Sequence, residues 1–242
     1  MKNILVTGAS RGIGRAIAVE LGQDACNLYL NSLTGGEKLE NVRSEIEKYR
    51  KENAIKGCVE PVPGDVGDPD FVREMFDGIG IDILINNAGI SYIGLIQDMT
   101  DEEWRRLIDV NLSSVHYCCK AAIPHMLAAG EGRIINISSV WGNCGASCEV
   151  AYSASKGGVN AYTKALAREL APSGIAVNAI ACGCVNTDMN RHFTEEEREA
   201  LCEEIPAGRW AEPEEVARLV KALCGQSTYL TGQVITFDGG WT

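Results

Sequence analysis

The sequence predicts an α/β fold in which a single doubly wound parallel sheet of about seven strands carries helices on both faces. Short apolar runs alternate along the chain with longer segments of helical pattern, as strand–helix–strand units require. No internal repeat, low-complexity tract or linker interrupts this alternation, and 242 residues suit one domain with a large core. We therefore expect residues 1–242 to form a single domain, with a substrate loop and helices near residues 183–210.

Four apolar runs in the first half of the chain predict buried strands, the third of them weakly: residues 4–6, 28–30, 57–62 and 83–85. Helical patterns follow these strands at residues 16–21, 38–53 and 70–77, and again from residue 101. The second of these helices is highly charged and is typical of a solvated outer face. The fourth has acidic residues in its first turn, which the helix dipole favours.

The second half of the chain adds three strands, at residues 133–137, 175–180 and 234–237. Residues 157–170 are rich in Ala, Lys and Leu and predict a helix after the first of these strands. Residues 182–194 are interpreted as a long loop that could close over a substrate, and a helix pattern follows at residues 195–203. A last helix begins at Glu212 and Pro213, because proline favours the first helical turn.

A glycine-rich turn, residues 7–14, lies between the first strand and the first helix. Its glycines, Gly8, Gly12 and Gly14, have the spacing Gly-x-x-x-Gly-x-Gly, which differs from the commoner Gly-x-Gly-x-x-Gly. Such a turn lets the backbone approach a pyrophosphate, and the helix N-terminus offers free N–H groups to it. Its position directly after a strand favours a dinucleotide site over an ordinary glycine-rich turn.

The end of the second strand indicates which dinucleotide binds. Enzymes that use NAD usually carry an acid there for the ribose 2′-hydroxyl, but Asn31, Ser32 and Leu33 include none. Arg11 in the glycine turn could pair with a 2′-phosphate, although it could also be a solvated side chain. NADP, as NADPH, is therefore favoured over NAD as the cofactor.

Ser139, Tyr152 and Lys156 form the candidate catalytic group. Ser139 follows the fifth strand, where open α/β sheets place their ligands, and Tyr152 and Lys156 share one face if both are helical. The Lys156 ammonium, helped by an oxidised nicotinamide, should lower the phenol pKa from about 10, so that Tyr152 can protonate a carbonyl oxygen while the carbon receives hydride. Ser139 would hold the same oxygen by a hydrogen bond. The alternative is that Tyr152 and Lys156 lie on a helix at this spacing without any catalytic role.

The composition argues against several other classes of protein. A net charge of −11 disfavours nucleic acid or an anionic membrane as a partner. We see no signal peptide and no apolar run of membrane-spanning length, so we expect a cytoplasmic protein. The ten cysteines lack metal-ligand spacing, and we expect them to be reduced and mostly structural, with no metal site.

Four motifs in register make the chain similar to the short-chain dehydrogenase/reductase family over essentially its whole length: residues 7–14, residues 86–89, Ser139, and Tyr152 with Lys156. The resemblance implies a Rossmann fold and an NADP- or NAD-dependent oxidoreductase that acts on a carbonyl/alcohol pair. It implies that Asn111 is a fourth catalytic residue, which anchors a water through which protons reach Lys156. It also implies a homotetramer or a homodimer.

Further positions are expected to contact the cofactor. Together with the glycine turn, the resemblance marks Gly8, Ser10, Arg11, Gly12, Ile13, Gly14, Asn31, Asp65, Val66, Asn87, Ala88, Gly89, Tyr152, Lys156, Val185 and Thr187. One position departs from the family, which usually has Pro-Gly after the sixth strand, where this chain has Cys182 and Gly183. Without proline the turn beside the nicotinamide should be looser. A redox role for Cys182 and Cys184 is an alternative.

The first substrate that the resemblance suggests is a 3-oxoacyl thioester. The chain resembles the 3-oxoacyl-[acyl-carrier-protein] reductases of fatty acid synthesis, which carry basic residues that dock the acidic carrier protein. The matching positions here are Gly130 and Ser173, and neither is basic. An acidic chain without them would dock that carrier poorly.

A narrower resemblance favours another substrate. Residues 141–149, residues 205–209 and the final Gly239-Gly240-Trp241 resemble the branch that completes a lysine modification on elongation factor P by reducing a 5-aminopentanone. Trp141 and Glu149 would lie on the substrate side, where Glu149 could pair with the substrate ammonium or could simply be a solvated loop residue. We expect modified elongation factor P as the substrate, and a thioester on acyl carrier protein is the rival.

An alternative of another class is an NADP-sensing regulator that has kept the fold and lost the chemistry. The complete set of Asn111, Ser139, Tyr152 and Lys156 argues against it, because a sensor has no need of a catalytic group. A purely structural role would leave the glycine turn unexplained.

Overall fold

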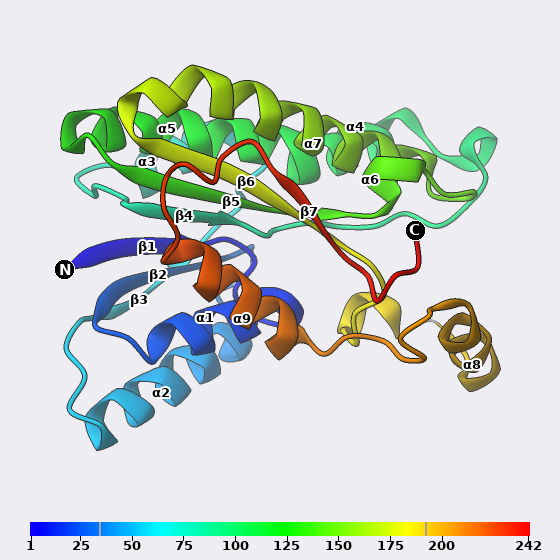
Figure 1. Cartoon of the computed structure of the whole chain (residues 1–242), viewed down its shortest axis with the longest axis horizontal. Helices are drawn as coiled ribbons and strands as arrows, with labels where there is room; N and C mark the ends of the chain where they lie inside the picture. Colours follow the sequence, from blue (N-terminus) through cyan, green and yellow to red (C-terminus); the bar gives the residue numbers. More distant parts are fainter. Residues whose placement is uncertain (34, 192) are drawn as a thin grey trace.

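The computed structural model describes residues 1–33, 35–191 and 193–242 of the chain. Its strands are β1 Lys2–Val6, β2 Cys26–Ser32, β3 Val59–Pro63, β4 Ile83–Asn86, β5 Gly132–Ser139, β6 Ile175–Cys182 and β7 Val234–Phe237. All seven pair in parallel in the order β3-β2-β1-β4-β5-β6-β7 (Figure 1). The predicted doubly wound sheet is confirmed.

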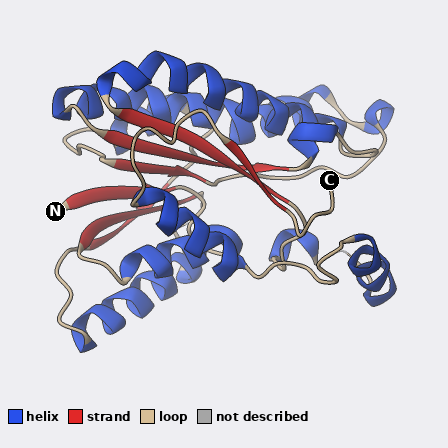
Figure 2. Ribbon diagram, in the orientation of Figure 1, coloured by secondary structure: helices blue, strands red, loops and turns tan. Residues whose placement is uncertain are grey.

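Helices cover both faces of this sheet (Figure 2). One face carries α1 Gly12–Gly22, α2 Glu37–Glu52 and α9 Pro213–Cys224, and the other carries α3 Pro69–Met75, α4 Asp101–Ile108, α5 Ser114–Ala129 and α7 Val150–Leu170. Two further helices, α6 Trp141–Cys144 and α8 Glu195–Glu204, lie near the carboxyl ends of the strands. Among the helices of the described residues, none has the length and apolar content of a membrane span.

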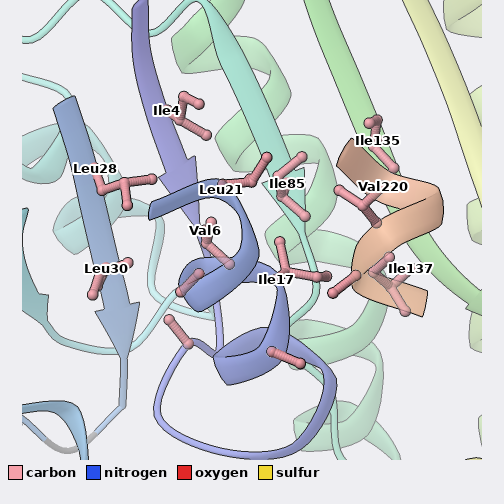
Figure 3. Close-up of a cluster of buried hydrophobic side chains, with 14 of the residues drawn as sticks. Ile4, Val6, Ile17, Leu21, Leu28, Leu30, Ile85, Ile135, Ile137 and Val220 are labelled. Carbon is pink, nitrogen blue, oxygen red and sulfur yellow. The ribbon is translucent and has the colours of Figure 1, made fainter. Parts of the chain in front are cut away.

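The sheet packs against both helix layers because successive residues of a strand point to opposite faces. Ile4 and Val6 of β1 belong to the core beneath α1, together with Ile17 (Figure 3). Leu5, between them in sequence, belongs to the second core with Met126 of α5. Each such side chain contributes roughly 1.5–3 kcal/mol when it is fully buried. Packing on both faces therefore holds β1 in place, and this fixes the position of the glycine turn that follows its carboxyl end.

Helix α7 begins at Val150, seven residues before the predicted start at residue 157. The residues of its first turns are small or polar, so their composition does not indicate a helix. A tertiary contact helps to hold the first turn, because Ser153 Oγ accepts a hydrogen bond from the Ala146 backbone N–H at 3.1 Å. Tyr152 and Lys156 therefore lie on one helix, as their spacing requires.

The predicted loop over residues 182–194 contains local structure, and its residue 192 lies outside the described residues. Asp188–Asn190 forms a 3-10 turn, η4, and Val185 forms an isolated parallel bridge with Ala211. Shorter turns connect other elements at η1 Ile96–Asp98 and η3 Ala171–Ser173. Between α4 and α5 the chain widens into a π-helical turn, η2 Asp109–Ser113, a form often found at functional sites.

Candidate functional site

The carboxyl ends of the strands surround one cavity of about 970 Å³. It lies where the strand order reverses, next to the boundary between β1 and β4, which is where open α/β sheets bind ligands. The turn after β1, the segments after β4 and β6, and the end of β5 all line it. The topology thus gathers residues from the whole chain around one site.

Glycine is required at two points of the turn after β1. Gly8 has a φ of +66°, and a Cβ on it would lie 2.9 Å from Ala88 Cα. A Cβ on Gly14 would lie 2.2 Å from the Gly8 carbonyl oxygen, so no larger residue lets α1 come this close. The backbone of residues 12–14, at the start of α1, therefore lines the cavity, where its free N–H groups suit a pyrophosphate.

Thr7 and Asn87 join the turn after β1 to the segment after β4. Thr7 Oγ1 accepts hydrogen bonds from the backbone N–H groups of Asn87 and Ala88, both at 3.0 Å. Asn87 Nδ2 donates to the carbonyl oxygens of Thr7 at 3.0 Å and Gly8 at 3.2 Å. The two segments therefore form one rigid part of the cavity wall, contributed by both halves of the sheet.

Asn31, at the end of β2, has the chemistry that a dinucleotide ribose needs. Its side chain is 1% exposed, and its Nδ2 donates to the carbonyl oxygens of Val62 at 2.9 Å and Gly64 at 3.1 Å. Its Oδ1 has no hydrogen-bond partner within the described chain. A buried acceptor without a partner is costly, and a ligand hydroxyl would satisfy it. The residues present here thus fit a nicotinamide dinucleotide.

Two of the cationic side chains that line the same cavity, Arg11 and Lys38, favour an additional phosphate. Arg11 and Lys38 both line it, and neither forms an ion pair with any residue that the structure describes. The carboxylate of Asp65 is instead neutralised by Arg106, with Nη1 and Oδ2 2.5 Å apart. Lys38 was not among the predicted site residues, because only the packing of α2 beside β2 brings it to the cavity.

Ser139, Tyr152 and Lys156 meet in this cavity. Ser139 is 7% exposed at the end of β5, and its hydroxyl is hydrogen-bonded to the Tyr152 side chain. The Trp141 backbone N–H also donates to Ser139 Oγ, at 3.2 Å. Lys156 Nζ lies 5.6 Å from the centroid of the Tyr152 ring and donates to the Ile137 carbonyl oxygen at 2.9 Å. The three side chains are therefore held in place by β5 and α7.

In the protein by itself the Tyr152 pKa is raised and not lowered, and the lowering expected from Lys156 together with an oxidised nicotinamide stays a prediction. Burial raises the pKa of the Tyr152 phenol, and the neighbouring Glu149 and Cys182 raise it further, whereas the hydrogen bond with Ser139 lowers it. Burial also lowers the pKa of the Lys156 ammonium, to about 8. Desolvation disfavours the charged form of each group, and it is the largest influence on both pKa values.

Asn111 lies in η2, behind the cavity lining. Its side chain is 1% exposed: Oδ1 accepts from the Ile90 N–H at 2.8 Å, and Nδ2 donates to the Ile90 carbonyl oxygen at 2.9 Å and Ser155 Oγ at 3.1 Å. A Cβ on Gly89 would lie 3.5 Å from Asn111 Oδ1 and 3.6 Å from Lys156 Nζ. Gly89 therefore lies close to both, and a water relay between them stays a prediction.

The substrate end of the cavity is aromatic and acidic. Trp141 and Glu149, the two predicted substrate residues, both line it. Trp241, which follows β7, has its ring centroid 4.9 Å from that of Trp141, and its Nε1 donates to Glu204 Oε2 of α8 at 3.4 Å. Trp241 and Glu204 were not among the predicted site residues: the resemblance included Trp241 in the same branch signature as residues 141–149, but only the fold brings its ring against Trp141.

Cys182, where the family usually has proline, is 5% exposed at the end of β6. Burial raises the pKa of its thiol to about 12, and Lys156 only partly opposes this. Burial also raises the pKa of the Cys184 thiol, to about 11. Such thiols stay protonated near neutral pH, so the alternative redox role gains no support. The turn is fixed in another way, since the Gly183 N–H donates to the Phe237 carbonyl oxygen at 2.9 Å.

All the residues predicted to contact the cofactor line this one cavity: Gly8, Ser10, Arg11, Gly12, Ile13, Gly14, Asn31, Asp65, Val66, Asn87, Ala88, Gly89, Tyr152, Lys156, Val185 and Thr187. Of the four predicted catalytic residues, Asn111 is the exception. Within the described residues, no group of three or more His, Cys, Asp or Glu side chains is placed to hold a metal ion.

The chain is similar to known proteins over most of its length. The family model for short chain dehydrogenase matches residues 2–198. The chain is 36% identical over 243 residues to an uncharacterized oxidoreductase, YmfI, from Bacillus subtilis (strain 168), covering 99% of this chain and 98% of that protein. It is 38% identical over 245 residues to the 3-oxoacyl-[acyl-carrier-protein] reductase FabG of Staphylococcus aureus (strain Mu50), covering 99% of this chain and 97% of that protein.

Solved structures are similar over the same length. A protein of Beutenbergia cavernae, assigned as an NAD(P)-dependent gluconate 5-dehydrogenase and crystallised with bound NADP at low occupancy, aligns with a TM-score of 0.90 and 33% identity. The alignment covers 99% of this chain and 96% of that one. A 3-oxoacyl-[acyl-carrier protein] reductase from Brucella melitensis aligns with a TM-score of 0.91 and 33% identity, covering 100% of this chain and 91% of that one.

Proposed function

Since this chain belongs to the short-chain dehydrogenase family and is an oxidoreductase of the alcohol–carbonyl pair, we propose that it reduces a ketone to a secondary alcohol with NADPH. The observation that carries the proposal is the meeting of Ser139, Tyr152 and Lys156 in a cavity that the glycine turn also lines. A cavity that merely sensed NADPH would not need a buried serine hydrogen-bonded to a tyrosine at its centre.

The chain's own residues handle the carbonyl oxygen. When bound, NADPH supplies the hydride that the carbonyl carbon receives. Tyr152 donates its phenolic proton to the oxygen, and the Ser139 hydroxyl holds that oxygen by a hydrogen bond as negative charge develops on it. Lys156, whose pKa is about 8, carries a proton at neutral pH and returns it towards Tyr152 after each turnover.

The preference for NADPH over NADH rests on charge. Arg11 and Lys38 line the cavity, and no acid stands at the end of β2, where the Asn31 side-chain oxygen has no partner among the described residues. A 2′-phosphate would gain charge-assisted hydrogen bonds from the two cations and would meet no carboxylate at that strand end. The Beutenbergia structure with bound NADP supports this preference.

For the substrate we place first a ketone that carries an ammonium group, as in the aminopentanone on elongation factor P. Two carboxylate side chains, Glu149 and Glu204, line the substrate end of the cavity. Carboxylates favour a cationic group through charge-assisted hydrogen bonds, and here Glu149 is partly buried whereas Glu204 is exposed. This end of the cavity therefore suits an aminoketone better than a neutral acyl chain.

A 3-oxoacyl thioester on acyl carrier protein is the second candidate, favoured by 38% identity to a reductase named for that substrate. Gly130 and Ser173, the positions where basic docking residues were sought, lie after α5 and in η3. Neither residue offers a cation to an acidic carrier protein. The chain should therefore bind acyl carrier protein weakly.

The test is NADPH oxidation by the purified protein with two substrates side by side: elongation factor P that carries the aminopentanone, and acetoacetyl-acyl carrier protein. We expect reduction of the first. Tyr152→Phe should lower kcat by a factor of about 100 or more, because the general acid is lost, while NADPH still binds. Turnover of the carrier-bound thioester alone would make this a 3-oxoacyl reductase. Equal turnover by wild type and Tyr152→Phe would contradict the proposed chemistry.

A further inference from the structure

We propose that Trp241, Trp141 and Glu204, which we call the tryptophan clamp, select the ketone by the width of the group beside its carbonyl. The inference rests on the proposed function, because it names the shape of substrate that the same cavity accepts. It assigns to Trp241, a residue far from the catalytic group in sequence, a specificity-determining role.

The backbone that carries Trp241 is held on both sides. Asp238 accepts hydrogen bonds from the backbone N–H groups of Gly240 at 2.9 Å and Thr242 at 2.8 Å, which flank Trp241. The Gly239 carbonyl oxygen accepts from the Ala207 N–H at 3.0 Å. An indole on a backbone tied at these points is a fixed wall of the cavity.

The clamp joins three elements that are distant in sequence. The rings of Trp141, in α6, and Trp241, after β7, lie at 60° with centroids 4.9 Å apart, within the range of favourable aromatic contact. Trp241 Nε1 donates to Glu204 Oε2, in α8, at 3.4 Å. The indole is therefore oriented by a ring on one side and a carboxylate on the other.

Trp141 connects the clamp to the catalytic group. Its backbone N–H donates to Ser139 Oγ at 3.2 Å. Helix α6 cannot move towards α7, because Gly142 already packs against Lys156: a Cβ on Gly142 would lie 2.6 Å from the Lys156 carbonyl carbon. A carbonyl held by Ser139 therefore lies next to Trp141, and its carbon chain has to pass the clamp.

Large side chains continue this wall. Met189, Phe193 and Leu201 line the same cavity, from η4, the segment after it and α8. An unbranched chain can lie between flat rings, whereas a ring or branch beside the carbonyl would meet them. The clamp therefore admits slender ketones and excludes wide ones.

The experiment compares two neutral probes that differ beside the reacting carbonyl: ethyl acetoacetate, with a methyl group, and ethyl benzoylacetate, with a phenyl group. We expect wild type to prefer ethyl acetoacetate. Trp241→Ala should raise the kcat/KM ratio of the wide over the slender probe roughly tenfold or more, since it removes a pocket wall. Trp241→Phe keeps an aromatic wall and should leave the ratio within about threefold of wild type.

Trp104→Ala is the matched control, because Trp104 lies on α4 and does not line the cavity. It should leave the ratio unchanged. Folding is checked by circular dichroism, in which the exciton couplet of the close Trp141–Trp241 pair should vanish in Trp241→Ala and persist in Trp104→Ala. If Trp241→Ala does not fold, Trp241→Leu retains apolar contact in a shorter side chain and should shift the ratio in the same direction.

Three outcomes would overturn the inference. An unchanged ratio in a folded Trp241→Ala protein with normal NADPH affinity would remove it and leave the proposed function intact. Failure of wild type to reduce the slender probe, while it reduces a protein-borne ketone, would also remove it, because the clamp is proposed to admit slender chains. No NADPH oxidation with any ketone would overturn the proposed function and this inference with it.

Discussion

Lys156 combines a place in the proposed catalytic group with nearly complete burial. Its side chain is 5% exposed and its Nζ has one hydrogen bond, to the Ile137 carbonyl oxygen, within the described chain. Burial lowers the pKa of this ammonium from 10.5 to about 8. At neutral pH the folded protein therefore keeps a charge where it is poorly solvated. This charge lowers the free energy of unfolding.

This cost predicts a pH dependence. Because the folded-state pKa of Lys156 lies below the unfolded value, the folded state binds its proton more weakly, and the destabilisation is complete below pH 8 and fades as the pH rises towards 10. Lys156→Met should therefore be more stable than wild type at pH 7, by up to about 3 kcal/mol, although inactive. Urea unfolding at pH 7, 8, 9 and 10 measures the difference.

The difference in the free energy of unfolding between Lys156→Met and wild type should narrow as the pH rises from 8 to 10. Above pH 10, ionisation of Tyr152 would also change the free energy of unfolding, because burial raises the pKa of its phenol in the folded state. The measurements therefore stop at pH 10. Equal free energies of unfolding at pH 7, or a gap that widens with pH, would contradict this account of Lys156.

At the scale of elements, the contact of α6 with α7 fixes the positions of the residues that are proposed to be catalytic. Gly142 of α6 lies against the backbone of Lys156, and Asn160 Nδ2 of α7 donates to Asn143 Oδ1 at 2.9 Å. Ser139 and Trp141 follow β5 directly into α6. Any separation of α6 from α7 would therefore move the serine away from the tyrosine.

Gly142→Ala should separate these helices, because the added Cβ would lie 2.6 Å from the Lys156 carbonyl carbon, a backbone atom that cannot turn aside. We expect a loss of about 1–3 kcal/mol in the free energy of unfolding, and a lower kcat. Chemical denaturation and steady-state kinetics measure both effects.

Gly157→Ala, on the α7 side of the same contact, is the control. A Cβ there would meet its nearest atom, the Gly142 carbonyl oxygen, at 3.4 Å, an ordinary contact. Alanine is the better helix former, so this variant should gain about 0.5–1 kcal/mol. If Gly142→Ala were as stable as Gly157→Ala, the packing argument would be wrong.

At the scale of the whole molecule, the cavity joins two halves of the sheet. The glycine turn, Asn31, Asp65 and Lys38 come from the β1–β3 half, and Ser139, Tyr152 and Lys156 come from the β4–β7 half. A dinucleotide that spans both should stabilise the whole domain. Ligand at 100 times its Kd contributes about 2.7 kcal/mol by mass action.

Thermal unfolding with each nucleotide tests the proposed NADPH preference. NADPH should raise the Tm more than NADH at equal concentration, and the double variant Arg11→Ala/Lys38→Ala should remove most of the difference by weakening NADPH roughly tenfold or more. Arg15→Ala is the control, since Arg15 pairs with Glu45 and does not line the cavity. Equal weakening of NADPH and NADH would show that the two cations do not recognise the 2′-phosphate.

Local pattern was sufficient to predict most of the fold and the centre of the site. The short apolar runs predict the strands, because a strand that is buried on both faces needs apolar residues along its whole length. The glycines of residues 7–14 and the pairing of Tyr152 with Lys156 can be recognised from the sequence, because backbone geometry and helical spacing are local constraints. The start of α7 was missed because a contact between Ser153 and Ala146 helps to hold it, and composition alone does not reveal that contact.

The sequence by itself determined the sheet, the glycine turn and the side chains that are proposed to react, because each depends on residues close together along the chain. Tertiary structure alone decided that Lys38 lines the cavity and that Trp241 contacts Trp141 and Glu204. It also decided the direction of the Tyr152 pKa, since the energy of a charge depends on how deeply folding buries it and on which distant groups come to surround it.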